Sequence, residues 1–249
     1  MSEIYTDIVR LPSHKANMYP DNPELSGDIE LRMMDVGDEK KVFGSYSEDM
    51  ISTLLKACVV KPEGFDPELL IPNDRHFLLV KLRVLSYGDS YHGDGVCPEC
   101  EHDEEHAFSI DDVPVYELDE NFCEPIEANL PVCKKKVGMR VLRQKDLSRI
   151  RSKAKKLSKT SDISVKEIEF TEKIVNRIVT IDGNEVTRSE AESFVKTLKA
   201  RDRAYMEYVL DKTKLGYDTM VTVTCSKCGE EYEIPFRMTT EFFRPRFDD

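Results

Sequence analysis

The feature that most constrains this chain is a pair of C-x-x-C motifs, CPEC at 97–100 and CSKC at 225–228. Each motif offers two thiolates with the spacing of one half of a zinc site, and a structural zinc takes four ligands. Residues 101–224 lie between the motifs, far more than the two knuckles of an ordinary zinc ribbon leave between them. A shared site therefore requires a fold that brings two distant segments together.

An internal repeat explains why the motifs are so far apart. A shift of 128 positions places one motif on the other, and the similarity continues on both sides. The aligned pairs include Asp74-Arg75 with Asp202-Arg203, Gly88 with Gly216, and Phe108 with Phe236. Further upstream, the segment at 29–42 resembles the one at 137–150, with insertions in the second copy. We interpret the chain as a duplication with repeats at 28–134 and 135–249, preceded by an extended N-terminal arm at 1–27.

Each repeat is expected to run strand, helix, helix and β-hairpin, which predicts an α+β fold. We expect single helices over 38–58 and 192–214, the second opened by a capping box of Thr187 and Glu190. Another helix is expected to begin near Pro72. Gly88 and Gly216 are expected to end their helices, and each C-x-x-C motif is expected at the turn of a hairpin.

If the repeats face each other about a pseudo-twofold axis, their hairpin turns meet. One four-cysteine site then results, formed by Cys97, Cys100, Cys225 and Cys228. We expect one structural zinc per chain, because four thiolates leave no coordination position for a substrate.

Other interpretations of the cysteines stay open. His102 and His106 offer a local site with the first motif, and reduced thiols without metal are a further alternative. A dithiol oxidoreductase is disfavoured, because both motifs are followed by strand-like sequence, whereas a thioredoxin-like C-x-x-C begins a helix.

Composition limits the class of partner. The net charge of −12 argues against nucleic acid, and against a zinc-ribbon nucleic-acid adaptor, because phosphate binding needs clustered Lys and Arg. No run approaches ~18 apolar residues, so we expect no membrane span. The start MSEIYTDIVRLPS has no signal-peptide pattern, which predicts folding in a cytosol. There is no Gly-rich phosphate loop, G-x-S-x-G or H-E-x-x-H, and we expect no enzyme.

Three segments are expected to contact other chains. The first is the N-terminal arm. The second is the basic stretch RIRSKAKKLSK at 149–159, either a solvated face or a docking site for an acidic partner. The third is the C-terminal TEFFRPRFDD, which could anchor in a partner's groove or pack on the chain's own body. The candidate partner-binding residues there are Phe242, Phe243, Arg244 and Phe247.

Several segments together resemble a phage family. They are ELRMMDVGDEK, DRHFLLVKLRVLSYGDSY with the C-P-x-C knuckle after it, the IDG turn, ARDRAYMEYVL, the C-x-x-C-G knuckle and the PF…FFRP ending. Over about residues 28–247 the chain resembles the baseplate-hub assembly proteins of T-even-type contractile-tailed bacteriophages.

This resemblance implies a non-enzymatic virion or assembly protein at the hub, where hub, tape-measure and wedge proteins meet. Its place would be the tail baseplate of the virion, and the host cytoplasm during assembly. Some relatives are structural components and others are assembly factors absent from the finished particle. A transient tail assembly chaperone is therefore the alternative, and a homo-oligomer stays open.

Overall fold

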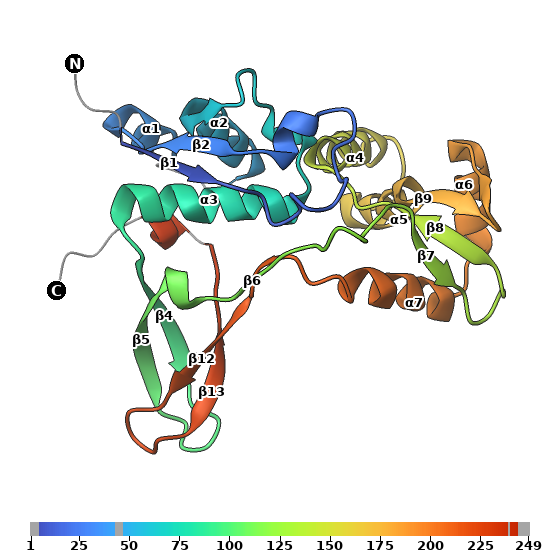
Figure 1. The fold of residues 1–249 in the computed structure, drawn as a ribbon. Helices are drawn as coiled ribbons and strands as arrows, with labels where there is room; N and C mark the ends of the chain where they lie inside the picture. The colour runs from blue at the N-terminus through green and yellow to red at the C-terminus, as the bar shows by residue number, and fades with distance from the viewer. Residues whose placement is uncertain (1–4, 43–46, 239, 244–249) are drawn as a thin grey trace.

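The structure is a computed structural model that describes residues 5–42, 47–238 and 240–243 (Figure 1). It has a mixed helix and sheet architecture, in agreement with the α+β class expected from the sequence. Two sheets, each with its own helices, form the body, and two β-hairpins project together from one side of it (Figure 1). The hairpins carry Cys97, Cys100, Cys225 and Cys228 at their far ends.

The first sheet is antiparallel, with the strand order β1-β2-β3. Its strands are β1 (Thr6–Val9), β2 (Ile29–Arg32) and β3 (Val59–Lys61). Its helices are α1 (Val36–Val42), α2 (Glu48–Cys58) and α3 (Pro72–Tyr87), with 3-10 turns η1 (Pro23–Ser26) and η2 (Pro67–Leu69). Two helices thus replace the single helix expected over 38–58. The reason is local, because Ser47 starts a new helix by accepting a hydrogen bond from the N–H of Met50.

The second sheet has the strand order β10-β9-β8-β7. Its strands are β7 (Ile126–Asn129), β8 (Lys136–Met139), β9 (Ile178–Ile181) and β10 (Asn184–Glu185). Its helices are α4 (Gln144–Leu157), α5 (Val165–Arg177), α6 (Arg188–Thr197) and α7 (Ala200–Asp211). The capping box of Thr187 and Glu190 is confirmed at the start of α6. The single helix expected over 192–214 is wrong, because Leu198 adopts extended backbone angles and separates α6 from α7.

The hairpins consist of strands β4 (Ser90–Val96) with β5 (Asp103–Ser109), and β12 (Met220–Thr224) with β13 (Glu231–Pro235). Between the hairpins and the body run η3 (Ile110–Asp112) and the paired strands β6 (Val115–Tyr116) and β11 (Gly216–Tyr217). Gly88 ends α3 with φ 83°, as predicted. Gly216 also has positive φ, but it lies in β11 against Asn73, and α7 has already ended at Asp211. Its role as a helix end is therefore corrected.

The segment 1–27 is not an extended arm in its described part. β1 pairs with β2 from Thr6↔Arg32 to Val9↔Ile29, which makes it an integral strand of the first sheet. Leu11, Met18 and Leu25 are fully buried in the main hydrophobic core. The segment lacks clear periodicity because it contributes single apolar side chains to the core from a looping path, a pattern that leaves no regular signal in the sequence.

The end of the described chain is also part of the core. Phe242 and Phe243, in the 3-10 turn η4 (Thr240–Phe243), are buried, with exposed fractions of 0% and 6%. The Phe242 ring packs against Tyr91 and Phe236 at the base of the hairpins. The expectation that these two rings anchor in a partner is corrected to packing on the chain's own body, which removes their apolar area from water. Arg244 and Phe247 lie outside the described residues.

Candidate metal centre

Each C-x-x-C motif forms the same tight turn at the tip of its hairpin. In the first turn the N–H of Cys97 donates to the carbonyl of His102 at 2.9 Å, and the N–H of Glu101 donates to the carbonyl of Cys97 at 3.0 Å. In the second turn Cys225 bonds Glu230 at 2.8 Å and Gly229 bonds Cys225 at 3.0 Å in the same way. The local sequence therefore builds two equivalent knuckles 128 positions apart.

In both knuckles the residue directly after the second cysteine has a left-handed backbone conformation, with positive φ. Gly229 has φ 80° in the second knuckle, which glycine adopts at no steric cost. Glu101 occupies the equivalent position of the first knuckle with φ 54°, a conformation that an L-residue adopts at a cost of roughly 1–2 kcal/mol. That a glutamate accepts this conformation indicates that the turn is fixed by its surroundings.

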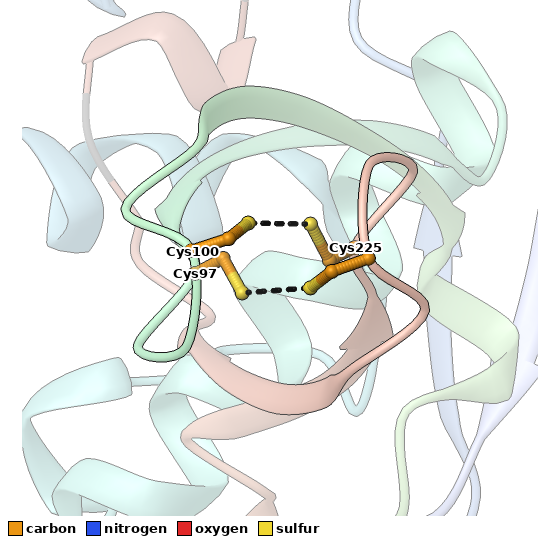
Figure 2. A group of neighbouring side chains, drawn as sticks. Cys97, Cys100 and Cys225 are labelled. Carbon is orange, nitrogen blue, oxygen red and sulfur yellow. Dashed lines mark hydrogen bonds between the residues drawn. The ribbon is translucent and has the colours of Figure 1, made fainter.

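The tips of the two hairpins meet, and their sulfur atoms face each other in pairs (Figure 2). The Sγ atoms of Cys97 and Cys228 are 3.6 Å apart, as are those of Cys100 and Cys225. All four sulfurs lie within 4.8 Å of one another. Four thiolates at ~2.3 Å from a tetrahedral zinc have sulfur–sulfur distances of about 3.8 Å. The group can therefore hold a metal ion without rearrangement of the backbone.

The four cysteines are free thiols in the structure, whereas a disulfide would bring two of their sulfurs to about 2.05 Å. Cys97 and Cys225 are buried, whereas Cys228 is exposed. The structure thus brings the four predicted ligands together, in one closed set on two hairpins. That they bind zinc stays a prediction.

The histidines of the first motif lie outside this group. His106 Nε2 is 2.7 Å from the hydroxyl of Tyr232, and neither His106 nor His102 belongs to a cluster of potential ligands within the described residues. Cys123 and Cys133 are exposed and are likewise not members of such a cluster in the described part of the chain. The local site that His102 and His106 offered has no support in this arrangement.

The pKa values of the thiols differ although knuckle amides contact several of them, because contacts with the neighbouring sulfurs lower the pKa of Cys97 and raise that of Cys228. Burial raises the pKa of the Cys97 thiol, but hydrogen bonds from the N–H groups of Cys100 and Glu99 lower it by more, so that its pKa is about 7. Burial raises the pKa of Cys225. The N–H of Glu230 lowers the pKa of Cys228, but burial and the neighbouring sulfurs raise it to about 12. Four thiols at this spacing resist joint ionisation, and a bound cation reverses that preference.

The two hairpins are held together by apolar packing beneath the sulfurs. Val223, Tyr232 and Ile234 of β12 and β13 are buried with Cys97 and Cys225 in a small separate core. On the β4 side a Cβ built on Gly95 would lie 2.5 Å from Ile234 Cγ2 and 3.0 Å from Tyr232.

A hydrogen bond also crosses between the hairpins, in addition to the contact of His106 with Tyr232. The N–H of Ser226 donates to Glu104 Oε1 at 3.0 Å. Sequence reasoning missed these contacts. The available signal was the G-D-G of β4, which places glycines on one face of a strand while the bulky residues of EYEIP occupy one face of β13.

A comparison with protein families gives one match. The model of the family described as T4 bacteriophage base plate protein matches residues 8–244. Neither a curated protein nor a solved structure matches the chain. Among the described residues, no helix combines the length and the apolar composition that a membrane crossing requires.

Proposed function

The chain belongs to the family of T4 bacteriophage base plate proteins, and from this premise we propose that it acts without catalysis in the baseplate hub, as a body that binds other tail proteins. The family supports a structural role in the virion tail. The position at the hub, next to hub, tape-measure and wedge proteins, is supported by the resemblance of the knuckles and of the FFRP ending. The observation that carries the non-enzymatic role is the closed four-cysteine group, which has no open position for a substrate.

The test of this function is the location of the protein. Quantitative mass spectrometry of purified particles should detect it together with the baseplate proteins, at a ratio that survives repeated density-gradient purification. Cross-linked baseplates should contain peptides that join it to other tail proteins. Abundance in infected lysate with absence from purified particles would overturn the structural role in favour of a transient assembly chaperone.

The metal proposed for the centre is zinc, one ion per chain. Its support is the set of four thiols with sulfur–sulfur distances of 3.6 Å across the two knuckles, close to the edges of a tetrahedral zinc–thiolate site. A zinc ion there would join residues 97–100 to residues 225–228. Zinc would then act as a structural link between the two hairpins, since metal binding contributes directly to the free energy of folding.

Zinc content separates this proposal from its alternatives. Purified wild-type chain should contain one zinc per chain, and Cys97→Ser and Cys225→Ser should each lose most of it. Cys123→Ser is the matched control, because Cys123 is exposed and lies outside the cluster. Zinc that stays bound to the Cys225→Ser variant would contradict a site shared by both motifs. If wild-type protein purified without chelator contains no zinc, the proposal that it binds zinc is wrong.

We also propose that the body is an internal duplication. One support is the matching sheet order, β1-β2-β3 in the first sheet and β7-β8-β9 in the second, both antiparallel. Another is the irregularity in the pairing of the middle strand with the strand that follows it in sequence. It falls between Glu30 and Leu31 in one sheet and between Gly138 and Met139 in the other. These positions are 108 apart, the same offset that aligns the two sequences there.

A partly buried ion pair and two hydrogen bonds around it further support the duplication. In the first half Arg32 Nη1 is 2.7 Å from Asp38 Oδ2, and Arg32 Nε donates to the carbonyl of Ala57 at 3.1 Å. The same carboxylate oxygen accepts the N–H of Asp35 at 3.2 Å. The guanidinium thereby links β2, the start of α1 and the end of α2.

The second half repeats this arrangement, with the arginine and the aspartate 108 positions later and the carbonyl 119 positions later. Arg140 Nη1 is 2.7 Å from Asp146 Oδ2, and Arg140 Nε donates to the carbonyl of Asn176 at 3.1 Å. Asp146 Oδ2 accepts the N–H of Arg143 at 3.1 Å. Charge-assisted bonds of this geometry specify how a strand, a helix start and a helix end meet. Such agreement in three separate contacts favours common descent of the halves over chance.

A shared contact of a buried aspartate moves the boundaries of the proposed repeats. Asp74 at the start of α3 accepts the N–H of Ser13 at 3.2 Å, and Asp202 at the start of α7 accepts the N–H of Val132 at 2.7 Å. Both donors follow a Leu-Pro pair, at 11–12 and at 130–131. The first repeat would then begin with β1, not at residue 28, and the second with β7, not at residue 135.

A further inference from the structure

Charge is distributed very unevenly along the chain. Residues 84–133 contain fourteen Asp and Glu and no Lys or Arg. Residues 134–159, which follow directly, contain twelve Lys and Arg and a single acidic residue, Asp146. The excess of acid in the whole chain is therefore concentrated in one segment, next to a segment of opposite charge.

The acidic segment includes the whole first hairpin. Glu104 faces the second hairpin, whereas Asp94, Asp103 and Glu105 lie on the opposite side of the ladder. In the β4–β5 ladder Asp94 lies opposite Glu105, and Asp103 lies opposite Val96, which is 60% exposed. Like charges directly opposite each other in an antiparallel ladder are destabilising. The outward face of an otherwise well-paired hairpin therefore carries an acidic strip around an exposed apolar residue, which a cationic surface would neutralise.

Four exposed acids of this hairpin have no cationic partner among the residues that the structure describes. They are Asp94, Glu99, Glu101 and Asp103. Other acids of the same segment do form ion pairs, for example Glu124 with Arg143 and Glu127 with Lys136. The first hairpin thus carries a group of four acids that no cation of the described chain compensates.

The basic segment includes α4, whose inner face packs through Ile150 and Ala154. Two of its cations are used internally, because Lys153 pairs with Glu172 and Arg149 pairs with Asp146. Four exposed lysines on α4 or just after it form no ion pair within the described chain. They are Lys145, Lys155, Lys156 and Lys159.

The two charged surfaces cannot neutralise each other within one molecule. Figure 1 shows α4 on the upper side of the body, whereas the first hairpin extends from the lower side to a distant tip. The acidic strand and the basic helix nevertheless have similar lengths. Seven residues of β4 span about 23 Å and fourteen residues of α4 span about 21 Å, from the rise per residue of a strand and of a helix.

We propose that a second copy of this chain docks the outward face of its β4–β5 hairpin on the exposed face of α4. The contact joins two different surfaces, so each bound molecule still offers one hairpin and one α4 to further copies. Such heterologous contacts generate closed rings, or rows if the rotation does not close. This inference goes beyond the proposed function and does not depend on the position at the hub.

A phosphate backbone is the other polyanion that α4 would attract. The acidic hairpin favours a protein partner, since a chain with a net charge of −12 repels nucleic acid except at α4 itself. The second copy has the further advantage that the same contact removes the like-charge repulsion within the β4–β5 ladder. Nucleic-acid binding is therefore tested as a contradicting outcome.

The experiment is a charge exchange followed by sedimentation velocity. Wild type should self-associate at about 50 mM salt and dissociate at about 500 mM, because screening weakens contacts between exposed charges. A helix-reversed variant, Lys145→Glu/Lys156→Glu/Lys159→Glu, and a hairpin-reversed variant, Asp94→Lys/Glu99→Lys/Asp103→Lys, should each associate at least tenfold more weakly.

An equimolar mixture of the two variants should associate again, because each then offers the surface that the other needs. The matched control, Lys166→Glu/Lys196→Glu/Lys199→Glu, changes the net charge as much as the helix-reversed variant does and should associate like wild type. A monomeric wild type at low salt, or a mixture that stays monomeric, would overturn the proposal. So would a monomeric wild type that binds duplex DNA through α4.

Discussion

The two hairpins build the same turn around their cysteines but present unlike faces to each other. β4 has Gly93 and Gly95 on its inner face, whereas β13 places Tyr232 and Ile234 opposite them. The first hairpin is also acidic, and the second has the apolar alternation. One hairpin supplies space and the other fills it, so the four-cysteine group is formed by two complementary hairpins rather than by two equal ones.

The two copies of the motif have kept their internal turn and have diverged on the surfaces that meet. The hydrogen bonds within a knuckle are local, and both copies keep them. The surface that meets the other copy is free to diverge, provided that the partner changes with it. The buried cluster beneath the sulfurs is small, with Val223, Tyr232 and Ile234 as its apolar members besides cysteine. This small cluster is not expected to keep the two hairpins together without the metal.

Removal of the metal should have the largest effect. Structural zinc contributes about 10–16 kcal/mol to folding of isolated zinc-binding peptides, so a chelator should separate the hairpin tips. Hydrogen exchange should increase strongly in β4, β5, β12 and β13 and little in α2 and α3, whose core is separate. Equal protection of the hairpins with and without chelator would contradict a role of the metal in joining them, because packing alone would then hold them together.

The matched ion pairs of the two halves come next. Asp38→Asn and Asp146→Asn each remove a nearly buried carboxylate from its arginine, and each should lower the free energy of unfolding by about 3 kcal/mol. Urea unfolding of both variants measures this. Similar losses would sharpen the proposed duplication. A loss of stability in one variant with none in the other would show that the two ion pairs do not have equivalent roles.

Gly95→Ala should destabilise the contact between the hairpins. Its new methyl group would lie 2.5 Å from Ile234 Cγ2, and overpacking of this kind costs about 1–3 kcal/mol. Val96→Ala, on the outward face of the same strand, is the control and should change stability by about 0.5 kcal/mol or less. The addition of Ile234→Ala should offset part of the effect of Gly95→Ala. Full additivity of the two changes would show that the residues do not meet.

Asp74 and Asp202 should respond differently to pH. Burial raises the pKa of Asp74 to about 6, although Ser13 and Tyr19 donate hydrogen bonds to it. Burial also raises the pKa of Asp202, but the N–H groups of Val132 and Cys133 lower it by more, so its net shift is downward. A carboxylate with a raised pKa takes up protons on folding, and one with a lowered pKa releases them.

The contribution of Asp74 to the free energy of unfolding should therefore increase by about 1 kcal/mol as pH falls from 7 to 5. In this range the carboxyl group becomes protonated in the folded state but stays ionised in the unfolded state. Urea unfolding of wild type and Asp74→Asn at both pH values measures this as a widening difference. The difference between wild type and Asp202→Asn should stay constant over this range and shrink below about pH 4. A constant difference for Asp74→Asn would contradict the raised pKa.

The smallest effect is expected at the left-handed position of the knuckles. Glu101→Gly should stabilise the first knuckle by about 0.5–1 kcal/mol, because glycine takes positive φ without steric cost. Gly229→Ala should destabilise the second by a similar amount. Thermal unfolding of the zinc-loaded variants measures both. A loss of stability in Glu101→Gly would mean that the glutamate side chain contributes a contact that outweighs its backbone strain.

Sequence patterns predicted the parts of the fold that depend on neighbours in the chain. The capping box at Thr187, the helix end at Gly88 and the hairpin turns all rest on hydrogen bonds between residues a few positions apart. The N-terminal segment and the rings of Phe242 and Phe243 were misjudged for the opposite reason. Their burial depends on surfaces formed by residues far away in sequence, which no local pattern reports.

The two equivalent knuckles, each with two thiols on a tight turn, and the membership of a phage baseplate family follow from the amino-acid sequence alone. The distance of 3.6 Å between the thiols of residues 97–100 and those of residues 225–228 follows from the tertiary fold. Turn chemistry acts over four or five residues, whereas the meeting of the tips requires closure of a long loop and a fit between Gly95 and Ile234. Such a fit exists only once both hairpins are folded.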